Sequence, residues 1–203
     1  MQTHIPAHII EETVQKERNR NVPRETDEAI YARYLEKGDS EDLRVLLERY
    51  RESFTLFLVG YVHNLEDAEE LMLDAFAVAA AGTSGFARRS SFKTWLFGIG
   101  RNLARKQYGR KKSVQAGETL RAAEQPDLTI LKNESRQELY EALETLPDDY
   151  RQVIYLLYYE DMTIDEIAKV MGKNKKQVYN LAFRGKQALR EVLERNGFEN
   201  AQY

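Results

Sequence analysis

Apolar residues recur along this chain at steps of three and four residues, and this spacing limits the fold more than any other feature. The clearest example is a set of eight apolar side chains that fall on one side of a helix: Leu43, Leu46, Leu47, Tyr50, Phe54, Phe57, Leu58 and Tyr61. A second stripe, in residues 65–81, consists of Ala68, Leu71, Met72, Ala75, Phe76 and Ala79. No segment alternates convincingly with the period of two that a strand shows. The sequence therefore predicts an all-α protein.

Breaks in the helical pattern divide the chain into two blocks. Gly38 is expected to end a helix over 27–37, and Ser40 to cap the next helix. Residues 113–130 show no clear period and include Gly117 and Pro126, so we interpret them as a flexible linker. We therefore expect two small helical bundles joined by this linker, with these boundaries: a polar N-terminal tail over 1–26, a first domain over 27–112, a second domain over 131–196 and a C-terminal tail over 197–203.

Composition excludes several classes of protein. No run of residues approaches the roughly 18–20 apolar residues that a membrane span needs, and the N-terminus lacks the apolar core of a signal peptide. Cysteine is absent, which excludes disulfides and thiolate metal sites. We find no glycine-rich phosphate loop, and the histidine outside the N-terminal tail, His63, has no nucleophile partner in the pattern. We therefore expect a cytoplasmic protein with no membrane insertion, no catalytic residue, no metal and no cofactor.

Charge is segregated along the chain although the net charge is only −3. Residues 64–74 hold five acidic residues and no basic one, whereas residues 86–112 hold nine basic residues and no acidic one. Residues 173–190 hold six basic residues and again no acidic one. Two basic patches on an acidic background indicate two contacts with one polyanion, as nucleic-acid binding requires.

The first basic patch coincides with a predicted helix over about 91–110. Phe92, Leu96, Ile99 and Leu103 share one side of this helix, which is expected to pack on the first bundle. The opposite side is expected to face solvent, and it carries Phe97, Arg101, Arg105 and Tyr108. Aromatic rings beside arginines suit a single-stranded or locally opened nucleic acid, because the bases stack and the phosphates attract the arginines. The alternative is an ordinary amphipathic helix with a solvated basic face.

The second basic patch has the spacing of a helix-turn-helix. Thr163 and Glu166 form a capping box that starts one helix, Gly172 ends it, and Asn174 is placed to cap the next. The side chains expected to point outward from the second helix are Lys176, Tyr179, Asn180, Phe183 and Gln187. Such a helix fits the major groove of DNA, where lysine and asparagine can read base edges. The position after the turn glycine is usually apolar and here is Lys173, and a chance helical hairpin is the alternative.

Taken together, four segments resemble the extracytoplasmic-function (ECF) sigma factors of bacterial RNA polymerase, over about residues 27–195. "NLEDAEELMLDAF" (64–76) resembles the core-binding helix of that family, and "SFKTWLFGIGRN" (91–102) resembles its promoter-melting segment. "LETLPDDYRQVIYL" (143–156) is similar to the start of its C-terminal domain, and the helix-turn-helix with "VYNLAFRGKQAL" completes the order. The resemblance implies a region 2-like first domain, a region 4-like second domain and a transcription initiation factor that is not an enzyme.

The resemblance also implies partners and site residues. Core RNA polymerase would contact the acidic helix through Asp67, Glu70, Leu71, Asp74 and Phe76. The opened minus-ten strand would be held by Phe86, Arg88, Arg89, Ser90, Ser91, Lys93, Arg101, Asn102 and Arg105, with Trp95 packing behind that site. The minus-thirty-five duplex would be read or held by Lys175, Lys176, Tyr179, Asn180, Phe183, Arg184 and Lys186. Members of the family are often held by an anti-sigma protein, and the outward aromatic Phe183 is a candidate contact for one.

Departures from the family pattern at four positions affect these expectations. Leu73 stands where the family often has glutamine, Ala79 and Ala80 stand where it often has a bulky or basic residue, and Gly100 stands where it often has alanine. We interpret Gly100 as a source of local backbone freedom beside Arg101 and Asn102, at a cost of roughly 1 kcal/mol of helix propensity. The competing function is an autonomous helix-turn-helix regulator with an N-terminal dimerisation or sensing bundle, which would bind duplex DNA tightly without polymerase.

Overall fold

The computed structural model describes residues 25–82, 85–115 and 143–195, and for residues 108–115 it describes the backbone alone. Within these ranges the regular elements are seven α-helices and one π-helical turn, without a strand, which confirms the all-α prediction. Most of both tails, most of the linker and the start of the predicted second domain lie outside the described residues.

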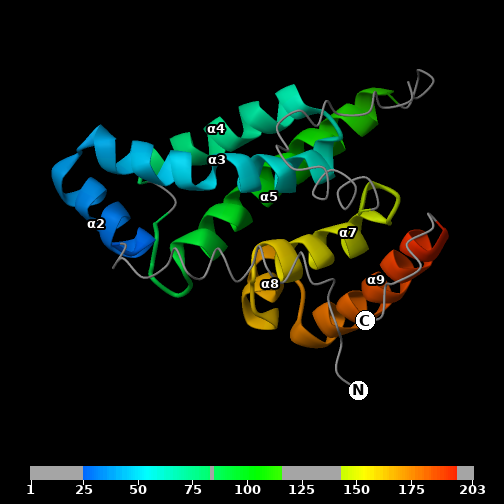
Figure 1. Ribbon diagram of the computed structural model, residues 1–203. Coiled ribbons are helices and arrows are strands. Elements are labelled where there is room, and N and C mark those ends of the chain that lie inside the picture. The colour runs from blue at the N-terminus through cyan, green and yellow to red at the C-terminus, as the bar shows by residue number, and fades with distance from the viewer. Residues whose placement is uncertain (1–24, 83–84, 116–142, 196–203) are drawn as a thin grey trace.

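Four helices form the first bundle: α2 (Asp27–Lys37), α3 (Ser40–Val62), α4 (Leu65–Ala80) and α5 (Phe92–Gln115). Helices α3 and α4 lie side by side, and α5 packs against both of them (Figure 1). Helix α2 packs on α3 and α5. Helix α5 continues through Gln115, three residues into the segment predicted as linker, because nothing in residues 113–115 breaks a helix.

The helix boundaries follow from capping residues. Gly38 ends α2 in the left-handed region at φ 69°, where its N–H donates to Tyr34 O at 2.8 Å, as predicted. The cap of α3 is Asp39 rather than Ser40, because the Asp39 carboxylate accepts from the backbone N–H of Glu41 at 3.0 Å. Asn64 caps α4 by accepting from Asp67 N at 2.8 Å. These caps fix the corners of the first bundle.

Three further α-helices form the second bundle. They are α7 (Asp148–Ile154), α8 (Ile164–Met171) and α9 (Lys175–Arg195). Pro147 precedes α7, which runs directly into the π-helical turn Tyr155–Tyr159, a feature that the sequence did not predict. Helix α9 packs on α7 and α8. Gly185 permits the close approach of α9 to α7, because a Cβ at this position would lie 3.0 Å from Cγ1 of Ile154.

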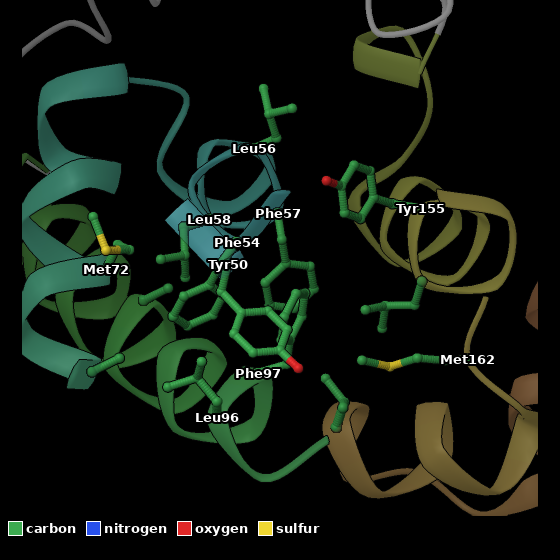
Figure 2. Packing of buried hydrophobic residues seen from close by; sticks show 14 of the residues in the cluster. Tyr50, Phe54, Leu56, Phe57, Leu58, Met72, Leu96, Phe97, Tyr155 and Met162 are labelled. Carbon is green, nitrogen blue, oxygen red and sulfur yellow. The ribbon is translucent and has the colours of Figure 1, made fainter. Parts of the chain in front are cut away.

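The two bundles share one hydrophobic core. Figure 2 shows Phe54, Phe57 and Phe97 of the first bundle facing Tyr155 and Met162 of the second. The rings of Phe57 and Tyr155 are 6.3 Å apart, and the Tyr155 hydroxyl donates to Ser53 O at 2.7 Å. Helix α8 also packs along α5 (Figure 1). The contact between the bundles was not predicted, because the linker suggested only that they were connected.

Close packing, rather than backbone freedom, accounts for the glycine at position 100. Gly100 is buried where α5 crosses α3. A Cβ there would lie 2.7 Å from Cε2 of Phe54 and 3.1 Å from Cδ2 of Leu58. The first distance is shorter than real carbon contacts allow, and the second is tight. The interpretation of Gly100 as a flexible point is therefore wrong.

Candidate nucleic-acid and partner interfaces

The turn between α8 and α9 has the geometry that its sequence predicted. Thr163 Oγ1 accepts from Glu166 N at 3.3 Å, and the Glu166 carboxylate accepts from Thr163 N at 3.0 Å, which completes the capping box. Gly172 has φ 60°, so it reverses the chain without strain. Asn174 caps α9, since its side chain accepts from Gln177 N at 2.9 Å. These residues fix the orientation of α9 relative to α8.

Lys173, which departs from the usual apolar residue after the turn glycine, has a defined role. Its backbone N–H donates to Ala168 O at 3.0 Å, which closes the turn. Its ammonium group contacts the Asp149 carboxylate at 2.9 Å. The side chain therefore joins the turn to the start of α7, and the apolar contact made by other proteins at this position is replaced by an ion pair.

The outward face of α9 is open to solvent. All seven residues predicted to contact the minus-thirty-five duplex are exposed: Lys175, Lys176, Tyr179, Asn180, Phe183, Arg184 and Lys186. Tyr179 and Phe183 are 61% and 64% exposed, whereas Val178 and Ala182 face the core. Lys175 is paired with Asp165 at 2.7 Å, and Lys186 lies 5.1 Å from the ring centre of Tyr158. This face combines positive charge, hydrogen-bond donors and exposed rings, which suits a nucleic-acid groove.

The loop before α5 rests on a cluster of aromatic rings. Phe86 packs at 5.7 Å from Tyr31 and 5.2 Å from Trp95, and Trp95 packs at 5.7 Å from Phe92. Trp95 therefore packs behind the loop, as predicted. Arg88 and Arg89 are exposed on this support. A rigid aromatic base with two exposed guanidinium groups can hold a flexible anionic strand.

The far side of α5 does not face solvent as predicted. Phe97 is fully buried, with its ring 4.8 Å from that of Phe54 and 5.0 Å from that of Phe57. Arg101 is only 8% exposed, beside Tyr61 and the turn at Gly172. The expectation of exposure is wrong for both residues, because α3 covers Phe97 and Arg101 lies between Tyr61 of α3 and the turn at Gly172. For Tyr108 only the backbone is described.

The hydrogen-bonding capacity of the Arg101 side chain is only partly satisfied. Burial raises the pKa of Tyr61 above its ordinary value, and a hydrogen bond and the positive charge of Arg101 oppose this rise. The Nε atom of Arg101 is buried without a hydrogen-bond partner within the described residues. Asn102 and Arg105, in contrast, are exposed. Of the three predicted strand-binding residues on this part of α5, two are open and one is covered.

At the start of α5, the second bundle supplies two carboxylates. Lys93 Nζ lies 2.5 Å from the buried Glu160 carboxylate and donates to Glu160 O at 2.7 Å. Ser91 Oγ and Thr94 Oγ1 each donate to Glu166 Oε1 at 3.2 Å. Burial favours the neutral form of Glu166, but hydrogen bonds from Thr163, Ser91 and Thr94 together outweigh it and lower the pKa of this carboxyl. Glu166 is therefore ionised where it contacts α5.

The acidic helix α4 exposes part of the predicted polymerase contact. Glu70 and Asp74 are exposed, whereas Leu71 and Phe76 are each only 3% exposed and face the core. Leu71 and Phe76 therefore support the helix and do not offer a surface, because they belong to its inward apolar stripe. Leu73 is 55% exposed next to Asp74, and sequence reasoning had treated it only as a departure. Its place outside that stripe was the signal that could have identified it as a surface residue.

A second buried network joins the start of α7 to the end of α3. Arg151 donates to both oxygens of Glu144 at 3.0 and 3.1 Å, to Leu146 O at 3.1 Å and to Asp148 Oδ1 at 3.0 Å. His63 Nδ1 lies 3.2 Å from Glu144 Oε2. The arginine of the "LPDDYR" segment is thus a structural residue.

Among the described helices, none is both long and apolar enough to cross a membrane.

Two models of known protein families match the two halves of the chain. The family model of sigma-70 region 2 matches residues 46–114, and that of sigma-70 region 4 matches residues 136–189. The chain is 24% identical to the RNA polymerase sigma-H factor of Pseudomonas aeruginosa over 184 residues, which cover 84% of this chain and 95% of that protein. It is 27% identical to the ECF RNA polymerase sigma-E factor of Escherichia coli K12 over 178 residues, which cover 81% and 92%.

Two solved structures have a similar fold. One is the sigma factor RpoE in complex with the anti-sigma factor NepR from Bartonella quintana, with a TM-score of 0.63, 23% identity, and coverage of 76% of this chain and 98% of that chain. The other is CnrH in complex with the cytosolic domain of CnrY, with a TM-score of 0.61, 22% identity, and coverage of 84% and 98%.

Proposed function

The chain belongs to the ECF family of RNA polymerase sigma factors, which direct promoter recognition, and we propose that it does so through three separate surfaces. Helix α9 reads the minus-thirty-five element, α5 with the loop before it holds the opened minus-ten strand, and α4 binds core polymerase. The corresponding domains are region 2-like over 27–112 and region 4-like over 131–196. The fully exposed basic face of α9 is the observation that carries this proposal.

On α9 the division of labour follows from side-chain chemistry. Lys176 and Asn180 lie one turn apart on the exposed face and supply donors for guanine and adenine edges. Tyr179 and Phe183 place rings beside them that can contact thymine methyl groups. Arg184 lies farther along the helix and holds a phosphate.

The minus-ten surface contributes strand contacts rather than duplex readout. Asn102 and Arg105 on α5, with Arg88 and Arg89 in the preceding loop, are exposed and able to meet an unpaired base and its phosphates. Lys93 and Arg101 belong to the same surface, but their present contacts must change before they can touch DNA. Holding an unpaired strand stabilises the opened promoter, which is how the protein assists melting.

Polymerase binding is assigned to the acidic face of α4. Glu70 and Asp74 present carboxylates, and Leu73 adds an exposed apolar side chain between them. A charged rim around an apolar contact is typical of a specific protein interface. Because the polymerase is cytoplasmic, polymerase binding supports a cytoplasmic location for this protein. One of the two similar folds is a sigma factor in complex with an anti-sigma factor, which supports a protein inhibitor as a further partner.

The decisive experiment is run-off transcription by purified bacterial core polymerase on a promoter library, with and without this protein. Specific transcripts that require the protein would support the proposal, and their aligned start regions would identify both promoter elements. Absence of transcripts and of co-elution with core polymerase, together with tight binding to duplex DNA alone, would instead favour an autonomous helix-turn-helix regulator.

Variants of the two DNA surfaces separate their roles. Asn102→Ala combined with Arg105→Ala is expected to retain polymerase binding and lose initiation, because both side chains are exposed and only the strand contact is removed. Lys176→Ala combined with Asn180→Ala is expected to weaken upstream recognition by about 1–3 kcal/mol per lost base contact. Normal transcription by the first variant, or an unchanged upstream preference in the second, would contradict the corresponding assignment.

A further inference from the structure

Part of the surface proposed to hold the opened strand is covered by the chain itself. Helix α8 and the segment before it pack along the first turns of α5 (Figure 1). Lys169 Nζ donates to Arg89 O at 2.8 Å, within the loop that precedes α5. At the other end of the contact, Arg101 lies beside Gly172, where a Cβ would be 3.5 Å from the guanidinium Nη1. The contact therefore extends from residue 89 to residue 101.

The chemical character of the contact resembles that of a bound nucleic-acid backbone. A strand phosphate would be held at the start of α5 by an ammonium group, hydroxyl donors and the positive end of the helix dipole. Here the ammonium of Lys93 is paired with the Glu160 carboxylate at 2.5 Å. The hydroxyls of Ser91 and Thr94 donate to the Glu166 carboxylate at 3.2 Å. Two carboxylates thus occupy the donors that a strand would use.

The covering is selective, because it leaves the other DNA surface open. The seven predicted contact residues of α9 remain exposed while Lys93 and Arg101 are engaged. A polyanion that reaches the start of α5 must therefore displace Glu160 and Glu166. A duplex that reaches α9 meets only the exposed contacts of Lys175 with Asp165 and of Lys186 with Tyr158 among those described.

We propose that the second bundle is an intramolecular cap, in which Glu160 and Glu166 take the place of strand phosphates and keep the free protein from binding an opened strand. The proposal rests on the function assigned above. Removal of the cap exposes Lys93, Arg101 and the hydroxyl donors together. Strand binding and cap closure are then mutually exclusive, so whatever separates the bundles also activates α5.

The test uses variants that remove the two carboxylate charges and preserve side-chain shape. Glu160→Gln combined with Glu166→Gln weakens both contacts, and glutamine remains compatible with the capping box of α8. Glu166→Gln alone is the milder variant if the double variant folds poorly. The matched control is Glu191→Gln combined with Glu194→Gln, which makes the same substitution and changes the same net charge on exposed residues of the same bundle.

Separation of the bundles is measured directly in the free, full-length protein. The chain contains no cysteine, so Ala77→Cys on α4 and Gln187→Cys on α9 give two unique, exposed sites for spin labels. With wild-type carboxylates, the labelled protein is expected to show one narrow distance distribution. The charge-removing variant is expected to show a second population at longer distance, with about a tenfold rise in the ratio of open to closed protein. The control variant is expected to match the wild type.

Strand binding is measured with a fluorescent single-stranded DNA of mixed sequence. The double Gln variant is expected to bind this probe about tenfold more tightly than the wild type, and the control variant only as tightly as the wild type. A broad distance distribution in the wild type, or variants that remain closed and bind no more tightly, would overturn the cap. These measurements need no polymerase, so they test the cap separately from the proposed function. The cap can be refuted while the protein still supports transcription, and it can be supported even if the protein does not.

Discussion

Replacement of Gly100 by alanine raises helix propensity but overpacks the core, and we expect the cost of overpacking to exceed the gain in propensity. Alanine gains about 1 kcal/mol over glycine inside a helix. The new Cβ would lie 2.7 Å from Cε2 of Phe54, closer still to Cζ of the same ring, and 3.1 Å from Cδ2 of Leu58, and both side chains are fully buried. Overpacking of this kind costs about 1–3 kcal/mol, and the rigid ring puts the cost near the upper end. We expect Gly100→Ala to destabilise the protein by about 1–2 kcal/mol.

Gly98→Ala is the matched control, because it makes the same substitution two residues earlier in α5. A Cβ at position 98 meets no atom within 4 Å, so this variant gains propensity without a clash and is expected to be stabilised by up to about 1 kcal/mol. Urea unfolding followed by circular dichroism gives both values, and the melting temperatures should differ by roughly 5–10 °C. If Gly100→Ala stabilises the protein as much as Gly98→Ala does, the packing argument fails.

Three further perturbations test the buried face and the networks. Phe97→Ala is expected to lower the free energy of unfolding by about 3–5 kcal/mol, because its ring is buried where the bundles meet, and a change below about 0.5 kcal/mol in urea unfolding would indicate a surface residue. Arg151→Ala is expected to lower the free energy of unfolding by about 3 kcal/mol in the same assay, because Glu144 loses a buried charged partner. Arg44→Ala is the control, because it removes only exposed ion pairs and should change the urea midpoint little. Equal losses of stability in the two variants would count against the buried network. The carboxyl of Glu166 has a lowered pKa in the folded protein, so its stabilisation is complete above its unfolded pKa of about 4.3 and is lost as pH falls through the folded value. On acidification from about pH 6 to about pH 3, the wild type should therefore lose more stability than Glu166→Gln, and parallel profiles would contradict this.

Features set by neighbouring residues were predictable from the sequence. Gly38 and Gly172 end their helices in the left-handed conformation, and Thr163 with Glu166 forms the expected capping box. Each depends on a few residues within one turn, so local chemistry determines it. The order of helices and the outward face of α9 follow for the same reason, because helical periodicity assigns each side chain to a face.

Features set by distant residues were not predictable. A helical wheel shows that Phe97 and Arg101 share a side of α5, but it carries no information on what covers that side. The cover consists of α3, which packs on Phe97, and of the turn at Gly172, which lies beside Arg101, and both are distant from these residues in the sequence. Gly100 was misinterpreted for the same reason, because its clash partner Phe54 lies on another helix.

For Leu71 and Phe76 the sequence contained the information, and family resemblance obscured it. Both residues belong to the apolar stripe of α4 that packs inward. Resemblance assigns a function to a segment, whereas periodicity assigns each residue to a face. When the two disagree on a helix, burial follows the periodicity.

The mixed character of the contact between the bundles makes it sensitive to temperature. Phe57 and Tyr155 form an apolar part of this contact, which also includes the ion pair of Glu160 and the hydrogen bonds of Glu166. Apolar association weakens on cooling because its driving force near room temperature is entropic. The bundles are therefore held together more by hydrophobic burial in warm conditions and more by charge and hydrogen bonds in the cold.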